Sequence, residues 1–155
     1  MITIYNNMVS KFECDKFINF YKNNSHLVKE TNNDLTYHFN SIDIKSKLDY
    51  FSFTKRFAGE TYIKKIRIQF FNNEILAIER PHGHDIPFNF VVFLNEEFEG
   101  GELIFENIKM TPKIGQLIYF TGNELHSIKK VISGDRYSLV GMSSSPIDFL
   151  KSSLI

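Results

Sequence analysis

The stretch that decides the fold is FNFVVFLNEEFEGGELIF, residues 88–105. It opens with phenylalanine and β-branched valine side by side, a composition that favours a strand over a helix. A second apolar run, LIF, follows the pair Gly100-Gly101, and glycines between apolar runs are typical of a turn. The whole chain contains 16 Phe and 7 Tyr among its 155 residues. We therefore expect a mainly β protein with a core rich in phenylalanine.

Short apolar runs separated by turn residues continue on both sides of this stretch. Glycines, prolines and an asparagine pair punctuate the chain from about residue 62 onward, and no helical pattern lies between them. We place strands at 62–71, 74–80, 86–94, 102–106, 115–120, 126–131 and 136–142. Strands at this spacing predict an antiparallel sandwich or barrel.

Before these strands, the sequence predicts helices. Ser10 and Glu13 form a capping box, in which the serine hydroxyl caps a free amide of the first turn and the glutamate reaches back to the Ser10 amide. A helix should begin there and end near Asn23-Asn24. A second helix is expected over 44–57, ended by Gly59.

The length and composition fit one domain. A chain of 155 residues with 43% hydrophobic side chains can bury a core of its own. We expect a single domain over 1–155. Within it, a mostly helical segment at 1–60 should support a β core at 61–145.

The balance of charges argues against several kinds of partner. Lys plus Arg and Asp plus Glu number 18 each, so no net field attracts nucleic acid or an anionic membrane. No apolar run approaches the roughly 20 residues that span a bilayer, and MITIYNNMVS lacks the pattern of a signal peptide. The single cysteine, Cys14, cannot form an internal disulfide, which fits a reducing compartment. We expect a cytoplasmic protein without nucleic-acid or membrane partners, in which a metal would be bound by His, Asp or Glu.

A candidate metal site lies in PHGHDIPF, residues 81–88. His82 and His84 share one face if this stretch is extended, and His126, on a later strand, could meet them across a barrel. Three imidazoles, or two with the Asp85 carboxylate, form a facial ligand set for a divalent first-row metal and leave positions open. The alternative is a solvated turn beside a proline, with Asp85 as its cap.

A candidate anion site follows ten positions after His126. Arg136 and Ser138 point the same way in a strand, and together they offer a planar guanidinium and a hydroxyl to a carboxylate. The alternative is a surface arginine paired with a nearby acid, which is a weak interaction. Apolar residues follow Arg136 at once, so we place it at the mouth of a strand rather than on a solvated face.

Three motifs in one order carry a family resemblance: VVFLNEEFEGGELIF, then TPKIGQLIYF, then HSIKKVISGDRYSL. In this order the chain resembles the iron(II)- and 2-oxoglutarate-dependent dioxygenases, in the prolyl-4-hydroxylase-like branch of bacteria and phages. The resemblance is strongest over 80–142, and ITIYNNMVSKFECDKFINFY looks like the opening strand and helix of that branch. It implies a mainly β (α+β) fold with flanking helices, a double-stranded β-helix, which is a jelly-roll or cupin-like barrel.

The resemblance also implies site residues. His126 matches the distal ligand of Fe(II), Arg136 the anchor for the far carboxylate of 2-oxoglutarate, and Ser138 a helper of that anchor. The family's first two ligands are a histidine and an acid separated by one residue, whereas here His84 stands at that distance from His82. Either both of these histidines bind the metal, or a bulge brings Asp85 to it, or the site binds no iron.

The function implied by the resemblance is hydroxylation of an unactivated C–H bond, with release of succinate and carbon dioxide. The substrate would be a small molecule or peptide, such as a prolyl or other peptidyl or amino-acid group. One alternative is a three-histidine oxygenase that does not use 2-oxoglutarate, and another is a non-catalytic or metal-only binding module on the same barrel. Arg136 distinguishes the three-histidine oxygenase from the 2-oxoglutarate-dependent enzyme, because an oxygenase that does not use 2-oxoglutarate needs no carboxylate anchor at this position.

Overall fold

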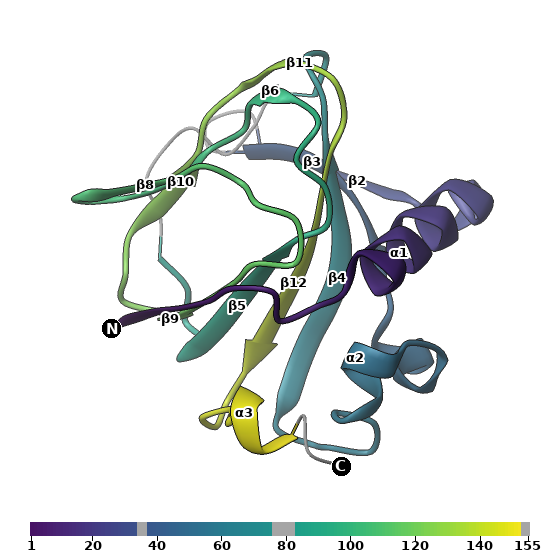
Figure 1. Cartoon of the computed structure of the whole chain (residues 1–155), viewed down its shortest axis with the longest axis vertical. Coiled ribbons are helices and arrows are strands. Elements are labelled where there is room, and N and C mark those ends of the chain that lie inside the picture. Colours follow the sequence, from purple (N-terminus) through teal and green to yellow (C-terminus); the bar gives the residue numbers. More distant parts are fainter. Residues whose placement is uncertain (34–36, 76–82, 153–155) are drawn as a thin grey trace.

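Two layers of antiparallel strands face each other in the computed structural model, which describes residues 1–33, 37–75 and 83–152 (Figure 1). The larger layer has the strand order β1-β9-β5-β12-β4-β3-β2. The smaller layer consists of the sheets β10-β7-β8 and β11-β6. Mainly β architecture is therefore confirmed.

The elements have the following bounds. The large sheet contains β1 (Ile2–Tyr5), β2 (Lys29–Asn33), β3 (Tyr37–Asp43), β4 (Ile63–Phe71), β5 (Phe88–Phe93), β9 (Leu117–Thr121) and β12 (Arg136–Ser143). The small sheets contain β6 (Glu99–Gly100), β7 (Leu103–Phe105), β8 (Ile108–Met110), β10 (His126–Ile128) and β11 (Val131–Ser133). The helices are α1 (Lys11–Asn23), α2 (Ser52–Lys55) and α3 (Phe149–Ser152), with 3₁₀ turns η1 (Ser25–Leu27) and η2 (Lys45–Tyr50).

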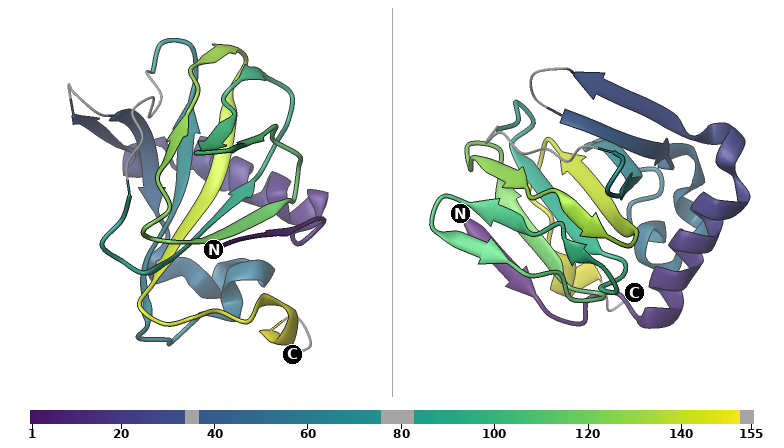
Figure 2. Two further views of the ribbon diagram at one scale, coloured as in Figure 1. Left: turned by 90° about the vertical axis from the view of Figure 1, so that its left-hand side faces the viewer. Right: turned by 90° about the horizontal axis from the view of Figure 1, so that it is seen from above.

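Strand β5 shows why the sheet is buried on both faces. Phe90 and Val92 belong to a core shared with the helices, whereas Val91 and Phe93 belong to a second core between the two layers. Successive side chains of a strand point to opposite faces, so the uninterrupted apolar run at 90–93 serves both cores at once. Helices α1 and α2 lie on one side of the large sheet, and the small sheets lie on the other (Figures 1 and 2).

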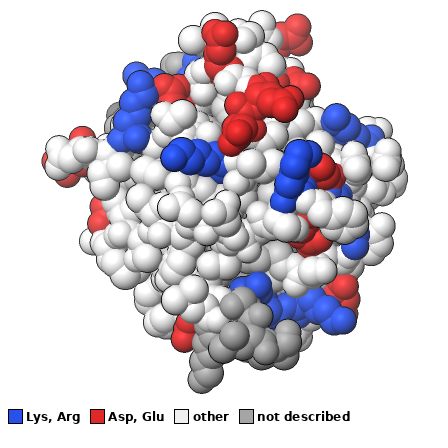
Figure 3. Space-filling model, in the orientation of Figure 1, with Lys and Arg blue, Asp and Glu red and all other residues white. Residues whose placement is uncertain are grey.

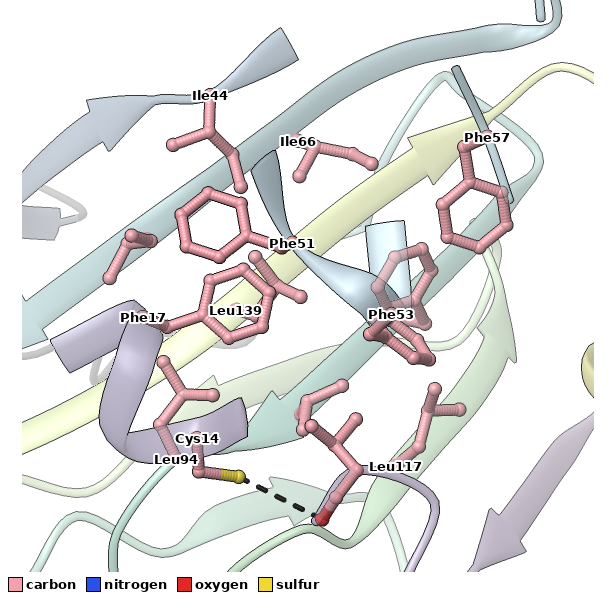
Figure 4. Close-up of a cluster of buried hydrophobic side chains, with 14 of the residues drawn as sticks. Cys14, Phe17, Ile44, Phe51, Phe53, Phe57, Ile66, Leu94, Leu117 and Leu139 are labelled. Atoms are coloured by element: carbon pink, nitrogen blue, oxygen red, sulfur yellow. Dashed lines mark hydrogen bonds between the residues drawn. The ribbon is translucent and has the colours of Figure 1, made fainter. Parts of the chain in front are cut away.

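The helix-side core is built on aromatic rings. Phe17 of α1 stacks on Phe51 with ring centroids 4.2 Å apart. Both rings lie over Ile66 of β4 and Leu139 of β12 (Figure 4). This contact fixes α1 against the two central strands of the large sheet.

The expected helix start at Ser10 is confirmed, but half of the capping box is wrong. The Ser10 hydroxyl accepts a hydrogen bond from the Glu13 amide at 3.1 Å, and α1 begins at Lys11, the residue after Ser10. The Glu13 carboxylate accepts the Phe53 amide at 3.0 Å instead of the Ser10 amide. Glu13 is thus buried to join α1 to the first turn of α2, an interaction between segments that the local pattern does not contain.

The single helix expected over 44–57 is wrong. The chain forms η2 and then α2, separated at Phe51, whose backbone is extended at φ −121° and ψ 134°. The extended residue directs its ring onto Phe17, and burial of that ring outweighs helix continuity. The expectation of a mostly helical 1–60 also needs correction, because β1, β2 and β3 lie there.

Most of the expected strands in the second half are confirmed, with three differences. The strand expected at 126–131 is two strands, β10 and β11, because Lys129 and Lys130 leave the ladder to bond with Glu102 and Gly101. Strand β8 and the short β6 were not expected. Of the strand expected at 74–80, residues 74–75 form a turn capped by Asn72, and 76–80 lie outside the described residues.

The surface carries both signs of charge. The face seen in Figure 3 has acidic side chains gathered over β6 and β11, and basic side chains are scattered below them. Within the part of the chain that the structure describes, no helix is both long and apolar enough to cross a membrane.

Candidate functional site

A cavity of about 660 Å³ opens between the two layers. Strands β4, β5 and β12 of the large sheet form one wall, and β7 and β10 contribute to the other. The loop 83–87 completes its rim. Polar and charged residues of the lining are Thr31, Lys65, Arg67, Gln69, His84, Asp85, Asn89, His126 and Arg136.

Two histidines meet at this cavity. The Nε2 atoms of His84 and His126 are 3.1 Å apart, close enough for a hydrogen bond or for both to bind one cation. The Nδ1 atom of His126 lies 3.1 Å from the carbonyl oxygen of Glu124. When Nδ1–H donates to that carbonyl, the Nε2 lone pair is left to face the cavity, as metal-bound histidines require.

Gly122 holds the loop that carries His84 against the turn that precedes His126. The His84 amide donates to the Gly122 carbonyl at 2.9 Å, and the Gly122 amide donates to the Pro87 carbonyl at 2.8 Å. A Cβ atom on Gly122 would lie less than 3.0 Å from the carbonyl oxygens of His84 and Ile86. Close backbone approach at this point therefore requires glycine.

Asn89 holds the same loop from the strand below. It is buried on β5, and its side-chain amide donates to the Ile86 carbonyl at 3.0 Å. The loop that carries His84 is thus fixed at both ends, by Gly122 and by Asn89.

Arg136 lies fully buried at the other end of the cavity. Its Nε atom donates to the Gly101 carbonyl at 2.8 Å, and Nη1 donates to the Ser138 hydroxyl at 2.7 Å. The guanidinium also lies against the rings of Phe71 and Phe93, at 5.3 and 5.6 Å from their centroids. The planar group is therefore fixed in one orientation.

The remaining nitrogen, Nη2, makes no hydrogen bond among the described residues. No acidic side chain of the described residues forms an ion pair with Arg136. Burial without a counter-charge lowers the pKa of Arg136 to about 9, so the group is still charged at neutral pH. Burial of a cation with an unused hydrogen-bond donor costs free energy unless an anion pairs with it. A carboxylate could balance the charge and accept a hydrogen bond from Nη2.

A family model described as the 2OG-Fe(II) oxygenase superfamily matches residues 64–142, which include His84, His126 and Arg136. The chain belongs to this superfamily.

Curated relatives of this superfamily match the chain over part of their length. It is 40% identical over 63 residues to a PKHD-type hydroxylase of Prochlorococcus marinus (strain NATL1A), covering 37% of the chain and 28% of the relative. A PKHD-type hydroxylase of strain MIT 9215 is 30% identical over 101 residues, covering 61% of the chain and 45% of the relative. The chain thus spans less than half the length of these relatives.

Solved structures show the same fold. A prolyl hydroxylase from Trichoplax adhaerens, in complex with a hypoxia inducible factor peptide fragment, superimposes with a TM-score of 0.73 at 16% identity, over 99% of this chain and 86% of that one. The viral collagen prolyl hydroxylase of Paramecium Bursaria Chlorella virus-1 gives 0.60 at 16% identity, over 91% and 87%. The double-stranded β-helix is therefore confirmed for this chain.

The predicted site residues have different places in the structure. His84, His126 and Arg136 line one cavity, and Asp85 stands at its rim with an exposed side chain. Ser138 is buried behind the cavity and supports Arg136. His82 lies outside the described residues. Within 1–33, 37–75 and 83–152, no cluster of three or more His, Cys, Asp or Glu forms a complete metal site.

The sequence-based predictions missed four residues that shape the candidate site. Gly122 and Asn89 position the His84 loop, and Lys65 and Arg67 add positive charge to the β4 wall. The two cations have a signal in the sequence, since they alternate with the buried residues Ile66 and Ile68 along the strand. The sequence around Gly122 indicates only a turn, because the loop that Gly122 contacts, at 83–87, is distant in sequence.

Proposed function

We propose that this chain is an Fe(II)- and 2-oxoglutarate-dependent hydroxylase whose reaction takes place in the cavity between the two layers. The observation that carries the proposal is Arg136, which is buried, fixed and unpaired by any acid of the described residues. It shares the cavity with the converging Nε2 atoms of His84 and His126. The two imidazoles suit a metal ion, and the arginine beside them suits a carboxylate. Together they suit a dicarboxylate that is bound next to a metal ion.

The donor set of the described residues fits Fe(II). Neutral imidazole nitrogens are ligands for first-row divalent metals, and the Nδ1 contact of His126 with the Glu124 carbonyl orients the ring. His126 is the proposed distal ligand. The other protein ligands come from the loop at 82–85, either as His82 with His84 or as Asp85 with one of them. In this family, the bound Fe(II) and 2-oxoglutarate supply oxidative attack on a C–H bond with release of succinate and carbon dioxide.

The residues around Arg136 bind and orient the co-substrate. Its Nη2 atom is the spare donor for the far carboxylate, while Gly101 and Ser138 hold the guanidinium in place. Phe71 and Phe93 keep water from that end of the cavity, which strengthens the charged contact. A three-histidine oxygenase that does not use 2-oxoglutarate would leave this buried cation without a function.

The proposed substrate is a prolyl or other peptidyl or amino-acid group. Support comes from the PKHD-type hydroxylase relatives and from the solved prolyl hydroxylase with its bound peptide fragment. Fold similarity alone does not select a substrate, so this part of the proposal rests on the relatives rather than on the cavity.

The test is an anaerobic titration of the purified protein with Fe(II) and 2-oxoglutarate. The expected result is the weak visible absorption band that appears when both are bound together. Arg136→Ala should weaken 2-oxoglutarate binding on the order of 100-fold, because it removes one partner of a buried charge pair. Iron binding should change much less.

Arg56→Ala is the matched control. Arg56 is also partly buried and bonds to a backbone carbonyl, of Phe149, but it does not line the cavity. Its loss should leave the band and the 2-oxoglutarate affinity unchanged. A folded wild-type protein that binds no stoichiometric metal would instead support the non-catalytic binding module.

A further inference from the structure

A buried glutamine lies beside the arginine end of the cavity. Gln69 of β4 is 4% exposed and lines the cavity. Ile68, the residue before it, packs in the helix-side core, so the side chain of Gln69 points to the space between the two layers. Within the parts of the chain that the structure describes, the Gln69 amide forms no hydrogen bond. Its two N–H donors and its acceptor oxygen are therefore available to a ligand in the cavity.

The strand register places Gln69 next to the residue that supports Arg136. Gln69 pairs with Ser138 between β4 and β12, whereas Arg136 pairs with Phe71. Paired residues of neighbouring antiparallel strands carry their side chains on the same face, with Cβ atoms about 5 Å apart. Nη1 of Arg136 donates to the Ser138 hydroxyl, so the guanidinium extends toward the cross-strand neighbour of Gln69.

The other side of Ser138 offers no polar side chain. There β12 pairs with β5, and the residue opposite Ser138 is Phe93, whose ring centroid lies 5.6 Å from the Arg136 guanidinium. The other residues that β4 adds to the polar lining, Arg67 and Lys65, pair with positions of β12 that lie further from Arg136. A ligand bound to the arginine therefore meets an aromatic ring on one side and the Gln69 amide on the other.

Gln69 also lies on the side of Arg136 that faces the two histidines. Arg136 stands at one end of β12, and Met142, near the other end, pairs with Asn89 of β5. Asn89 bonds to the loop of His84, so the histidine end of the cavity lies toward Met142. The partner of Gln69 on β12 lies between these two ends, close to the arginine end. A dicarboxylate that reaches from the histidines to the arginine therefore passes Gln69.

We propose that the Gln69 amide donates a hydrogen bond to the far carboxylate of 2-oxoglutarate, beside the bond from Nη2 of Arg136. The inference rests on the proposed function for the presence of the co-substrate, and it adds a binding residue. An ionised carboxylate has about four acceptor sites, and in a buried site each one without a donor costs free energy. Gln69 thereby makes the site selective for a 2-oxo acid that carries a second carboxylate.

The experiment measures binding by calorimetry to protein loaded anaerobically with Fe(II). It compares 2-oxoglutarate with 2-oxopentanoate, which has the same chain length but a methyl group in place of the far carboxylate. Gln69→Met keeps the length of the side chain and removes its hydrogen-bonding groups. It should bind 2-oxoglutarate about tenfold more weakly, as expected for the loss of one hydrogen bond to a charged group. Its affinity for 2-oxopentanoate should stay within about twofold of wild type, because the affected carboxylate is absent from that acid.

Gln69→Glu is the second variant, and it has nearly the shape of the wild-type side chain. Its carboxylate can pair with Arg136 and so competes with the co-substrate for that cation. The affinity for 2-oxoglutarate should therefore fall by about 100-fold or more. Both variants should keep the Fe(II) affinity within about twofold, because Gln69 does not belong to the proposed ligand set.

Gln116→Met is the matched control. Gln116 is as deeply buried, at 5% exposure, but its amide donates to the Asn6 side chain at 2.8 Å and it does not line the cavity. The control variant should lose stability to urea through the broken hydrogen bond. It should keep the wild-type affinities for both 2-oxo acids.

Failure of this inference is distinguishable from failure of the proposed function. If the wild type gives the Fe(II)–2-oxoglutarate band and Gln69→Met keeps the full preference for 2-oxoglutarate, Gln69 does not bind the carboxylate and the enzyme assignment stands. An equal loss for both acids shows a structural role and also overturns the inference. If no band forms, glutarate titrated into the metal-free protein still decides, because the wild type should bind it more tightly than Gln69→Met. Equal binding of glutarate, or none, overturns the inference.

Discussion

The Nε2 atoms of His84 and His126 lie 3.1 Å apart although 42 positions separate the two residues in sequence. One ring comes from a loop before β5 and the other from the first residue of β10. They meet because the backbone of the His84 loop bonds to Gly122, in the turn between β9 and β10. The convergence of the two rings is therefore a property of the His84 loop packed against the turn before β10 rather than of either motif alone.

Replacement of His126 by alanine should remove metal binding while leaving the fold intact. His126 supplies one of two converging nitrogens. Loss of this proposed ligand should lower Fe(II) or Ni(II) affinity by more than roughly 100-fold, since even the loss of a group that only orients a metal ligand costs about 10–100-fold. Calorimetric titration with the metal measures the effect.

His38→Ala is the control for this variant. His38 pairs with Glu30 at 2.9 Å on the β2–β3 hairpin and does not line the cavity. Metal affinity equal to wild type in His126→Ala, or an equal loss in His38→Ala, would remove His126 from the site.

Gly122→Ala should weaken metal binding from outside the ligand set. The added methyl group would meet the carbonyl oxygens of His84 and Ile86 and push the loop away from His126. We expect a loss of about 1–3 kcal/mol in the free energy of unfolding, measured by urea denaturation, together with lower metal affinity.

The comparison variant is Gly59→Ala. Gly59 has a φ of +80°, so alanine is strained there, but nothing lies within 4 Å of the added methyl group. It should lose stability at unchanged metal affinity. If Gly122→Ala behaves in the same way, the contact of the two loops does not position His84.

The sequence predicted the features that depend on local patterns of residues. The phenylalanine- and valine-rich run of β5 predicted a strand, and the structure buries that strand on both faces. The ten residues from His126 to Arg136 contain β10 and β11 and lead into β12, so the two side chains stand on opposite walls of the cavity. The role of Ser138 follows from strand alternation, because Ser138 shares the face of Arg136 and its hydroxyl accepts a hydrogen bond from that guanidinium.

The features that it missed depend on contacts between distant segments. Strands β2 and β3 pair along polar residues such as KETNN, whose stability comes from backbone bonding at the sheet edge rather than from apolar alternation. Phe51 breaks a helical pattern because Phe17 buries its ring. The pairing of β2 with β3 cannot be predicted from the residues of either strand alone. The burial of the Phe51 ring likewise depends on Phe17, a residue distant in sequence.

Phe17→Ala should destabilise the protein by about 3–5 kcal/mol, because it leaves a cavity between α1 and the large sheet. Phe17 is fully buried and stacks on Phe51 at 4.2 Å. Phe12→Ala, on the same helix, should change stability by no more than about 0.5 kcal/mol, since Phe12 is 81% exposed. Urea denaturation followed by circular dichroism measures both. Equal losses would mean that α1 is not held by its buried face.

The protein should lose stability in alkaline solution as pH rises from about 10 toward 12. Burial raises the pKa of Tyr137 to about 12, and burial with the nearby Tyr137 hydroxyl raises that of Tyr21 to about 12. The unfolded chain loses these protons near the ordinary tyrosine pKa of about 10, whereas the folded chain still holds them. Above pH 10 the unfolded state therefore binds fewer protons, and the free energy of unfolding falls with increasing pH.

Tyr137→Phe should make this fall shallower, because phenylalanine keeps the ring contacts with Tyr21 and Phe70 but has no proton to lose. Urea denaturation at intervals between pH 8 and pH 11 measures the slope. Tyr50→Phe, at a tyrosine that is 57% exposed, should leave the slope as in wild type. A slope unchanged in Tyr137→Phe would show that the alkaline loss comes from other groups, of which buried Cys14, with its pKa raised to about 12 by desolvation, is the next to test.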